Sequence, residues 1–344
     1  MKAKSSDFRT IRSYRLSVLF IFLLLLGFTS ALSIAFGSTA FTPEELLEHL
    51  LLEQDSTKGR ILLKIRLPRA LAAGLVGCSM ALSGCILQGI MRNPLASPNI
   101  IGVSSGAGLA AVIIFILFPG FYYLVTPMAF IGAFFTTLVV YSLSWKDGAS
   151  PLRLVLSGIA VSSFLNAGSH SLMIFYPDRI HNVIGFMVGS LTAITWQDVM
   201  TLWPYAIAGG GLSFILAGQL NILTIGDETA TGLGVNVERI RMLFIMIASV
   251  MAAAAVSVVG LLGFVGLIVP HLARLIIGNN ARYLIPASML LGAIIVILCD
   301  LIGRVIMAPL ELPVGIVMAF VGAPFFIFLL RKDGIKTNRK NHGH

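Results

Sequence analysis

The sequence predicts an all-α polytopic membrane protein with ten transmembrane helices and both termini in the cytoplasm. Of its 344 residues, 57% are hydrophobic and only 11% are charged, whereas a soluble domain has roughly 25% charged residues. Uncharged runs of about 20 residues, the length that crosses a bilayer, recur from Ser17 to Leu330. The positive charges gather on the segments that this topology places in the cytoplasm. A soluble globular fold is therefore excluded.

The ten spans are apolar segments long enough to cross about 30 Å of hydrocarbon at about 1.5 Å per residue. The seventh and eighth share one stretch, residues 242–270, which holds no formal charge and is too long for a single untilted span. Gly260, Gly263 and Pro270 offer places for this stretch to turn back, so a hairpin of two helices is predicted. The expected spans are residues 16–36, 70–91, 99–118, 122–144, 152–173, 199–217, 241–262, 264–278, 284–302 and 313–330.

The distribution of Lys and Arg sets the orientation. An even number of spans puts both termini on one side, and with that side in the cytoplasm 17 of the 24 Lys and Arg residues are cytoplasmic. The dense exception is a basic group within residues 58–69, on the outer side. The predicted organisation is a basic cytoplasmic tail (1–15), one ten-helix membrane domain (16–331) and a second cytoplasmic tail (332–344).

The first span could instead be a cleaved signal peptide, because basic residues precede it and small residues follow it near residues 38–40. Its apolar core of about 21 residues exceeds the roughly 7–15 of a signal peptide. A retained first helix is therefore favoured.

The sequence lacks the motifs of an enzyme or an ATPase. No Gly-Lys pair occurs, so the G-x-x-x-x-G-K-[ST] loop that cradles nucleotide phosphates is absent. The six histidines show no H-E-x-x-H spacing, and Cys78, Cys85 and Cys299 lie in apolar runs, where they are interpreted as packing residues. The net charge of +9 lies at the membrane edges and does not indicate nucleic acid. We therefore predict no catalysis, no metal site, no cofactor and no nucleic-acid partner.

Ionisable residues in mid-membrane, which mark the ion path of a coupled carrier, are nearly absent. Asp300 stands near a helix end, four residues before Arg304, so an i,i+4 ion pair is favoured over ion binding. Both an ion-coupled secondary carrier and an ungated pore are disfavoured.

Two arginines open the second span at the outer surface. Arg66 and Arg69 flank Pro68, which suits the first turn of a helix. Cations at a helix N-terminus oppose the helix dipole, so an external carboxylate partner would explain them. Snorkelling to lipid phosphates is an equally good explanation.

Residues 221–241 form a polar cytoplasmic segment. Within it, Asp227 is expected to cap a short helix that runs through Leu233, and glycines on either side would end that helix sharply. A compact helical knob facing the cytosol suits a protein partner. An ordinary connector between two spans is the alternative.

A polar stripe runs along the fifth span, where Ser162, Asn166 and Ser169 recur at i, i+4 and i+7, with His170 adjacent. Such a stripe is costly against lipid, so it indicates an inward face that either lines a water-filled pathway or forms interhelical hydrogen bonds.

Small residues form a second type of face. In the tenth span, Gly315, Ala319 and Gly322 lie on one side. Gly102 and Gly106, four residues apart after the second span, would let a neighbouring helix approach closely.

Five segments in this order resemble the FecCD-type permeases, and the resemblance covers residues 15–331. These permeases are the membrane subunits of type II ABC importers for iron-siderophores, haem and cobalamin. The resemblance implies ten helices in two inverted halves and a dimer of permeases bound to two ATPases. The segments that carry it are residues 66–69, 93–108, 226–234, 263–271, and 311–315 with 322–326.

The resemblance also implies roles for particular residues. Those matching the positions that dock acidic side chains of an extracytoplasmic binding protein are Arg66, Arg69 and Arg304. Those matching the coupling helices that sit in a cleft of the ATPase are Gly226, Asp227, Glu228, Thr229, Ala230, Gly232, Leu233 and Gly234. Those matching the pathway lining are Ser162, Asn166, Ser169, His170, Gly315 and Ala319.

The function that the resemblance implies is ATP-driven import across the cytoplasmic membrane by alternating access, with ATP hydrolysis on a separate subunit. The implied partners are a cytoplasmic ABC ATPase dimer, an extracytoplasmic substrate-binding protein, a second permease subunit (a copy or a paralogue) and membrane lipid. Ferric siderophore is the favoured cargo, with haem and cobalamin as alternatives. The rival classes are an ion-coupled secondary carrier and a membrane-embedded binding or scaffold protein.

Overall fold

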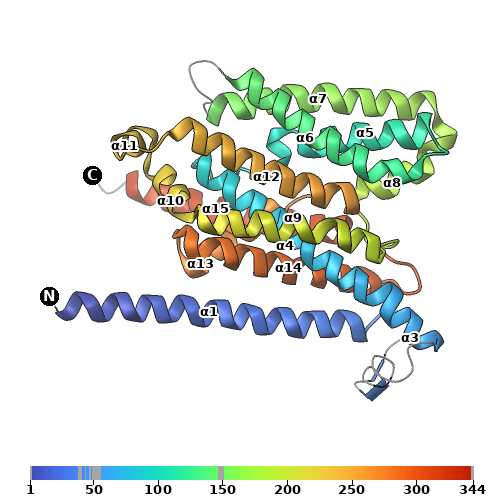
Figure 1. The fold of residues 1–344 in the computed structure, drawn as a ribbon, viewed down its shortest axis with the longest axis horizontal. Coiled ribbons are helices and arrows are strands. Elements are labelled where there is room, and N and C mark those ends of the chain that lie inside the picture. Colours follow the sequence, from blue (N-terminus) through green and yellow to red (C-terminus); the bar gives the residue numbers. More distant parts are fainter. Residues whose placement is uncertain are drawn as a thin grey trace.

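The computed structural model describes residues 2–37, 41–42, 44–45, 48, 56–145 and 151–341, and every regular element in these ranges is a helix (Figure 1). The long helices run side by side along one axis. The N-terminal end of α1 (Lys2–Ala35) and the C-terminal end of α15 (Val314–Asn341) lie at the same end of the bundle as the short helix α11 (Asp227–Gly232). We call this the α11 end, and the opposite end, where α1 finishes, the Asp300 end.

The central helix is α4 (Leu67–Ile90), which packs against α14, α12, α13 and α9. It is preceded by α3 (Thr57–Ile61) and a π-helical turn, η1 (Leu62–Arg66). In the most apolar part of Thr57–Ile90, 78% of the residues are buried, against 28% for the corresponding part of α1. Because α1 begins at Lys2, the basic tail expected at 1–15 and the first span form one continuous helix.

Most expected spans coincide with a helix. The break predicted within residues 242–270 is confirmed, since two helices, α12 and α13, are joined by 260–264, while the crossing of the membrane by both stays a prediction. Several short elements were not expected, among them α3, η1, α8, α10 and the 3-10 turn η4. The remaining helices are α5 (Val103–Leu117), α6 (Val125–Ser144), α7 (Pro151–Phe175), α8 (Ile180–Val188), α9 (Trp196–Ile215), α10 (Ala217–Ile225), α12 (Val237–Val259), α13 (Val265–Ile277) and α14 (Ala281–Val305), with the 3-10 turns η2 (Pro98–Ile101), η3 (Tyr122–Leu124) and η4 (Pro177–Arg179).

Six of the described helices are long and apolar enough to cross a membrane, and α9 with α10, bent by 59° at their junction, would make a seventh span. Three shorter apolar helices are α5, α13 and the Val314–Phe328 part of α15. With 13 residues, α13 is about 20 Å long, less than the roughly 30 Å of a hydrocarbon core. The chain is thus a polytopic helical protein, while the count of ten spans and the cytoplasmic termini stay predictions.

Glycines set the closest helix contacts. A Cβ added at Gly77 of α4 would collide with the carbonyl oxygen of Gly292 on α14, and one at Gly106 of α5 would collide with that of Gly132 on α6. The close approach expected at Gly106 is confirmed. Such backbone contacts suit a membrane protein, where helices associate through packing rather than through the hydrophobic effect.

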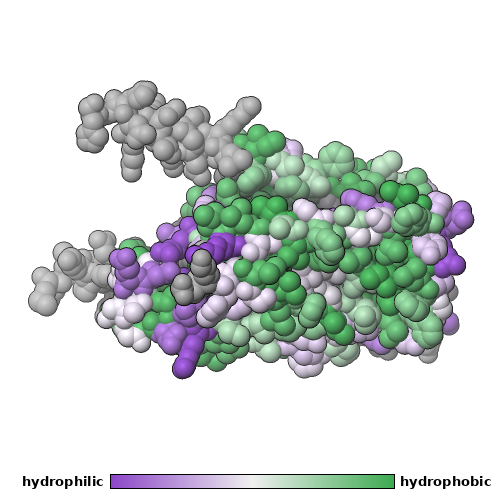
Figure 2. All heavy atoms as spheres, turned by 90° about the horizontal axis from the view of Figure 1, so that it is seen from above, coloured by the Kyte–Doolittle hydropathy of each residue, from purple (hydrophilic) through white to green (hydrophobic). Residues whose placement is uncertain are grey.

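Large apolar side chains cover the middle of the molecule. Figure 2 shows hydrophobic residues over the centre of one face, with hydrophilic residues gathered most densely toward the α11 end. Among the exposed side chains are Phe135 (63%), Phe164 (78%) and Phe320 (77%). A soluble monomer rarely exposes so continuous an apolar surface, so this belt faces lipid or another subunit.

Candidate functional site

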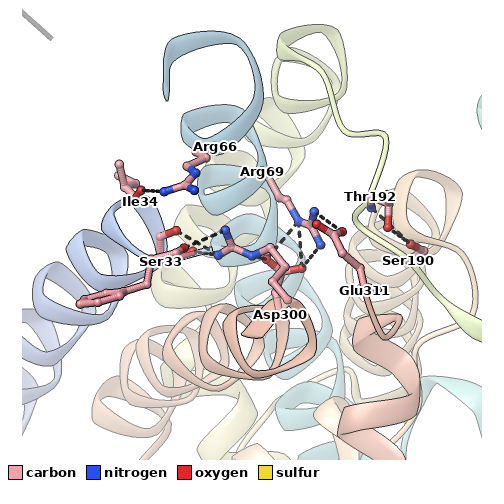
Figure 3. Close-up of polar contacts among 10 residues, drawn as sticks. Ser33, Ile34, Arg66, Arg69, Ser190, Thr192, Asp300 and Glu311 are labelled. Carbon is pink, nitrogen blue, oxygen red and sulfur yellow. Dashed lines mark hydrogen bonds and ion pairs between the residues drawn. The ribbon is translucent and has the colours of Figure 1, made fainter. Parts of the chain in front are cut away.

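At the Asp300 end, one buried carboxylate is shared by two arginines (Figure 3). Asp300, on α14, has a side chain that is 1% exposed. Arg69 of α4 places Nη2 2.9 Å and Nε 3.0 Å from Asp300 Oδ1. Arg304, one turn further along α14, places Nε 3.1 Å from Asp300 Oδ2. The i,i+4 pair predicted from the spacing of Asp300 and Arg304 is confirmed.

Arg69 also reaches a carboxylate at the surface. Its Nη1 lies 2.8 Å from Glu311 Oε2, and the Glu311 side chain is 32% exposed. Glu311 belongs to the segment between α14 and α15. Arg69 therefore links the central helix α4 both to the buried Asp300 and to the chain that leads into α15.

The other contacts of these arginines cap the C-terminus of α1. Arg304 Nη2 donates to Ser33 O at 2.9 Å and to Ser33 Oγ at 2.7 Å. Arg66 Nη1 donates to Ile34 O and Ala35 O, each at 2.9 Å, and its guanidinium lies 4.7 Å from the centre of the Phe41 ring. The last carbonyls of a helix lack intrahelical partners and carry the negative end of the helix dipole. Two cations at this point hold the end of α1 against α4 and α14.

These contacts correct one expectation. An external carboxylate is not needed to explain the cations at the start of the second span, because Asp300 and Glu311 are partners of Arg69 within the chain. Arg66, Arg69 and Arg304 are each only 5% exposed. No local signal could have identified the Arg69–Asp300 pair, because 231 positions separate the two residues. Docking of a binding protein by these arginines stays a prediction.

At the α11 end, Asp227 is also shared by two arginines. Its Oδ1 lies 3.0 Å from Arg92 Nη2, and its Oδ2 lies 2.8 Å from Arg241 Nη2. Arg92 directly follows α4 and has a positive φ of 49°. Arg241, on α12, is 3% exposed and also bonds to Glu238 Oε1 at 3.1 Å. We call this group the Asp227 clamp, because it joins α11 to the ends of α4 and α12.

The short helix expected after Gly226 is present as α11, but Asp227 does not cap it. Gly226 holds the N-cap position with a φ of 133°, and no side chain caps the helix. The carboxylate of Asp227 points to Arg92 and Arg241 instead. The sharp ends predicted from glycine are confirmed, since Gly234 has a φ of 80°. Ion pairing has replaced the capping role because two arginines from other helices converge on this position.

One side of α11 is free of contacts with the bundle. Ala230 is fully buried, whereas Leu233, directly after the helix, is 62% exposed. The other exposed residues of this segment are Glu228, Thr229, Thr231, Gly232 and Gly234. The knob therefore presents a small, mixed polar and apolar surface at its end of the molecule.

The polar stripe of the fifth span divides between two faces of α7. Ser162 Oγ accepts a hydrogen bond from Ser105 Oγ of α5 at 3.1 Å, and the buried Ser169 donates to Leu165 O at 3.2 Å. Asn166 and His170 are exposed. Of the stripe, Ser162 thus bonds to another helix, Ser169 bonds within α7, and Asn166 and His170 face away from the rest of the chain.

The small face predicted for the tenth span divides in the same way. Gly315 N donates to Gly189 O at 3.1 Å, and a Cβ at Gly315 would collide with Val188 O at the end of α8. The same helix α8 accepts a hydrogen bond from Leu261 N through Phe186 O at 2.8 Å. Ala319 is exposed. The short, mostly apolar segment 180–188, ended by Gly189, was the overlooked sequence signal for this junction.

Among the described residues, no group of three or more His, Cys, Asp or Glu side chains could hold a metal ion. The described polar clusters consist of arginine–carboxylate pairs, which suit positioning and electrostatic docking rather than covalent chemistry.

Known proteins resemble this chain over nearly its whole length. Residues 23–332 match the FecCD transport family. The chain is 38% identical over 331 residues to the Fe(3+)-citrate import system permease protein YfmE of Bacillus subtilis, with 95% of this chain and 99% of that protein covered. It is 42% identical over 274 residues to the cobalamin import system permease protein BtuC of Halobacterium salinarum, covering 79% and 74% of the two chains. A solved structure described as an inward-facing metal-chelate type ABC transporter matches with a TM-score of 0.83, 31% identity, and coverage of 92% and 99%.

Proposed function

The chain belongs to the FecCD transport family, and from that premise we propose that it is the permease subunit of an ATP-driven importer of a ferric chelate, with ferric siderophore as the favoured cargo. It is a multi-pass protein of the cytoplasmic membrane, and ATP hydrolysis belongs to a separate subunit. In this proposal the α11 end faces the cytoplasm and the Asp300 end faces outward.

The Asp227 clamp is the observation that carries the mechanism. An ATPase that grips the exposed side of α11 would move a helix whose first residue is bonded to Arg92, at the end of the central helix α4, and to Arg241 of α12. Charge-assisted hydrogen bonds are short and directional. Motion of α11 would therefore pass to two long helices at once, which is the connection that alternating access requires.

In this proposal an extracytoplasmic binding protein docks at the Asp300 end. The cluster there gathers three guanidinium groups, those of Arg66, Arg69 and Arg304, and Asp300 and Glu311 are the carboxylate partners of Arg69. A positive surface steers an acidic partner toward it and fixes its orientation. Glu311 is the carboxylate that an incoming acidic side chain could replace, because it is the exposed one of the two.

The exposed residues of the polar stripe on α7 and of the small-residue face on α15 suit contact with a second permease subunit and a pathway between the two subunits. Asn166 and His170 on α7 and Ala319 on α15 face away from the chain's own core. The neighbouring Phe164 and Phe320 are 78% and 77% exposed. A partner permease, whether a copy or a paralogue, would cover the phenylalanines and leave the polar positions along a water-filled passage.

Two cargo classes have support from relatives. The YfmE relative is named for ferric citrate, and the BtuC relative, the more similar over a shorter stretch, is named for cobalamin. Ferric chelate is preferred because the match to YfmE extends over nearly all of both chains. Cobalamin is the second candidate.

Reconstitution tests the proposal. The chain in liposomes should take up no radioactive iron under a proton or sodium gradient, and uptake should appear when the ATPase, the binding protein and ATP are supplied. Parallel assays with ferric citrate, a ferric hydroxamate and cobalamin identify the cargo. Gradient-driven uptake by the isolated chain would reject the assignment in favour of a secondary carrier.

A further inference from the structure

A cavity of about 330 Å³ lies at the α11 end, between α4, α10, α13 and α14. A water molecule takes up about 30 Å³ of liquid volume, so the space could hold a ligand several times that size. Its polar lining includes Arg92, Arg274, Gln88, Asn93, Asn221 and Asn279. This lining contains two arginines, four amides and a hydroxyl, and it contains no carboxylate.

The two arginines differ in how their charges are balanced. Arg92 is paired with Asp227, and the second arginine on that carboxylate, Arg241, also has Glu238. Arg92 therefore has a carboxylate partner outside the cavity lining. Arg274, in the last turn of α13, makes no ion pair and no side-chain hydrogen bond with any described residue, although it is partly buried. The cavity therefore carries one uncompensated positive charge, and a partly buried cation without a partner is unfavourable.

A buried acceptor adds a second requirement. Gln88 is 3% exposed, and its Nε2 donates to Leu267 O at 2.9 Å and to Gly266 O at 3.4 Å. Two carbonyl partners fix the amide so that Oε1 is the free end. This Oε1 is buried and has no hydrogen-bond partner in the described part of the chain. A ligand that satisfies it must donate a hydrogen.

We propose that this cavity binds a phosphate group that also carries a hydroxyl, with Arg274 neutralising its negative charge and Gln88 Oε1 accepting its hydrogen bond. Guanidinium groups match the geometry of phosphate oxygens, and the side-chain amides of Asn93 and Asn279 in the lining offer further donors. Two sources share this chemistry: free hydrogen phosphate from the cytoplasm, and the glycerol-phosphate headgroup of phosphatidylglycerol. The site lies beside the Asp227 clamp, and its occupant would be positioned to bias the clamp.

Binding to the purified full-length chain tests this proposal without any transport assay, so its failure is distinguishable from failure of the proposed function. Equilibrium dialysis with inorganic phosphate measures the affinity of the chain for the first source, free hydrogen phosphate. Sulfate is the control, because it has a similar size but no proton at neutral pH, and it should bind at least about tenfold more weakly since Gln88 Oε1 stays unsatisfied. Native mass spectrometry after extraction from phosphatidylglycerol or phosphatidylcholine nanodiscs counts retained lipid.

Three variants locate the binding. Arg274→Gln removes the charge, and affinity should fall about tenfold or more because a charge-assisted hydrogen bond is lost. Thr224→Trp fills the cavity from an exposed position while leaving Arg274 intact, and it should also abolish binding. Arg282→Gln is the matched control, because Arg282 is an exposed arginine at the start of α14 that does not line the cavity.

The site is supported if inorganic phosphate or phosphatidylglycerol binds the unmodified chain and Arg282→Gln but not Arg274→Gln or Thr224→Trp. Whichever of the two ligands binds the unmodified chain identifies the source. Unchanged affinity in Arg274→Gln and Thr224→Trp would overturn the proposal. So would the absence of binding by both probes, including the case in which an ATPase side chain proves to occupy the cavity.

Discussion

The two arginine–carboxylate clusters have the same connectivity, but their shared carboxylates differ in burial. At the Asp300 end, Asp300 is bonded to two arginines and its side chain is 1% exposed. At the α11 end, Asp227 is bonded to two arginines and its side chain is 40% exposed. A buried carboxylate that loses its arginines stays desolvated, whereas an exposed carboxylate can exchange them for water at lower cost. The buried Arg241 would keep Glu238 as a partner when it separates from Asp227. We therefore expect the Asp300 cluster to be structural and the Asp227 clamp to break and re-form during a transport cycle.

The largest effect is expected from Asp300→Asn. The change keeps the size of the side chain but leaves Arg69 and Arg304 with 7% and 5% exposed side chains beside a neutral amide. Removal of one partner from a buried ion pair costs about 3–5 kcal/mol. Thermal unfolding in detergent, followed by tryptophan fluorescence, should show a large loss of stability or no recoverable folded protein.

Asp178→Asn serves as the control for that experiment, because Asp178 is an exposed carboxylate near the same end of the bundle. A change at such a surface position usually stays within about 0.5 kcal/mol. If both variants unfold at the same temperature, burial does not distinguish the two clusters and the comparison fails.

Asp227→Asn should have a smaller effect on stability and a larger one on coupling. Arg241 keeps Glu238 as a partner and Arg92 is already exposed, so the expected loss is about 1–2 kcal/mol. ATPase-driven uptake should fall further than stability does, because α11 loses its connection to α4 and α12. The measurement pairs unfolding with uptake in liposomes.

Glu228→Gln, on the exposed side of the same helix, provides the comparison for Asp227→Asn. Its stability should equal that of the unmodified chain. A drop in uptake for Asp227→Asn that merely matches its loss of folded protein would contradict the coupling role of the clamp.

The two clusters also separate what the sequence can predict from what it cannot. The Asp300–Arg304 pair follows from one turn of helix, and the breaks around α11 follow from Gly226 and Gly234, since both depend on neighbours in the chain. The residues of the Arg69–Asp300 contact are 231 positions apart and those of the Asp227–Arg92 contact are 135 apart. Only the packing of the helix bundle brings these residues together. Hydrophobicity located the long helices for the same local reason. It missed α8 because a nine-residue helix that includes His181 and Asn182 is too short and too polar to indicate a span.

Glu311→Gln tests the replaceable contact at the Asp300 end. Its side chain is about one-third exposed, so its loss should cost less than about 1 kcal/mol of stability. Arg69 would then present more positive charge to the outside, and an acidic binding protein should associate faster, with a steeper dependence on salt. Association and dissociation rates measured by surface plasmon resonance at two ionic strengths give the result.

Glu45→Gln is the matched control for Glu311→Gln, because Glu45 also pairs with a cation before the second span, Lys58, yet lies outside the cluster. Equal acceleration by both variants would point to the overall charge of this end rather than to Arg69.

The smallest effect on stability is expected from Leu233→Ser, which makes it the most selective probe of the α11 end. Leu233 is 62% exposed and Leu310, at the opposite end, is 70% exposed, so serine at either position should change stability by less than about 0.5 kcal/mol. If the ATPase grips α11, only Leu233→Ser should weaken co-purification of the ATPase, because an apolar side chain buried on binding contributes to the contact. Equal ATPase retention by both variants would contradict the assignment of α11 as the ATPase contact. The interpretation of the Asp300 cluster would still stand, because it depends only on burial within this chain.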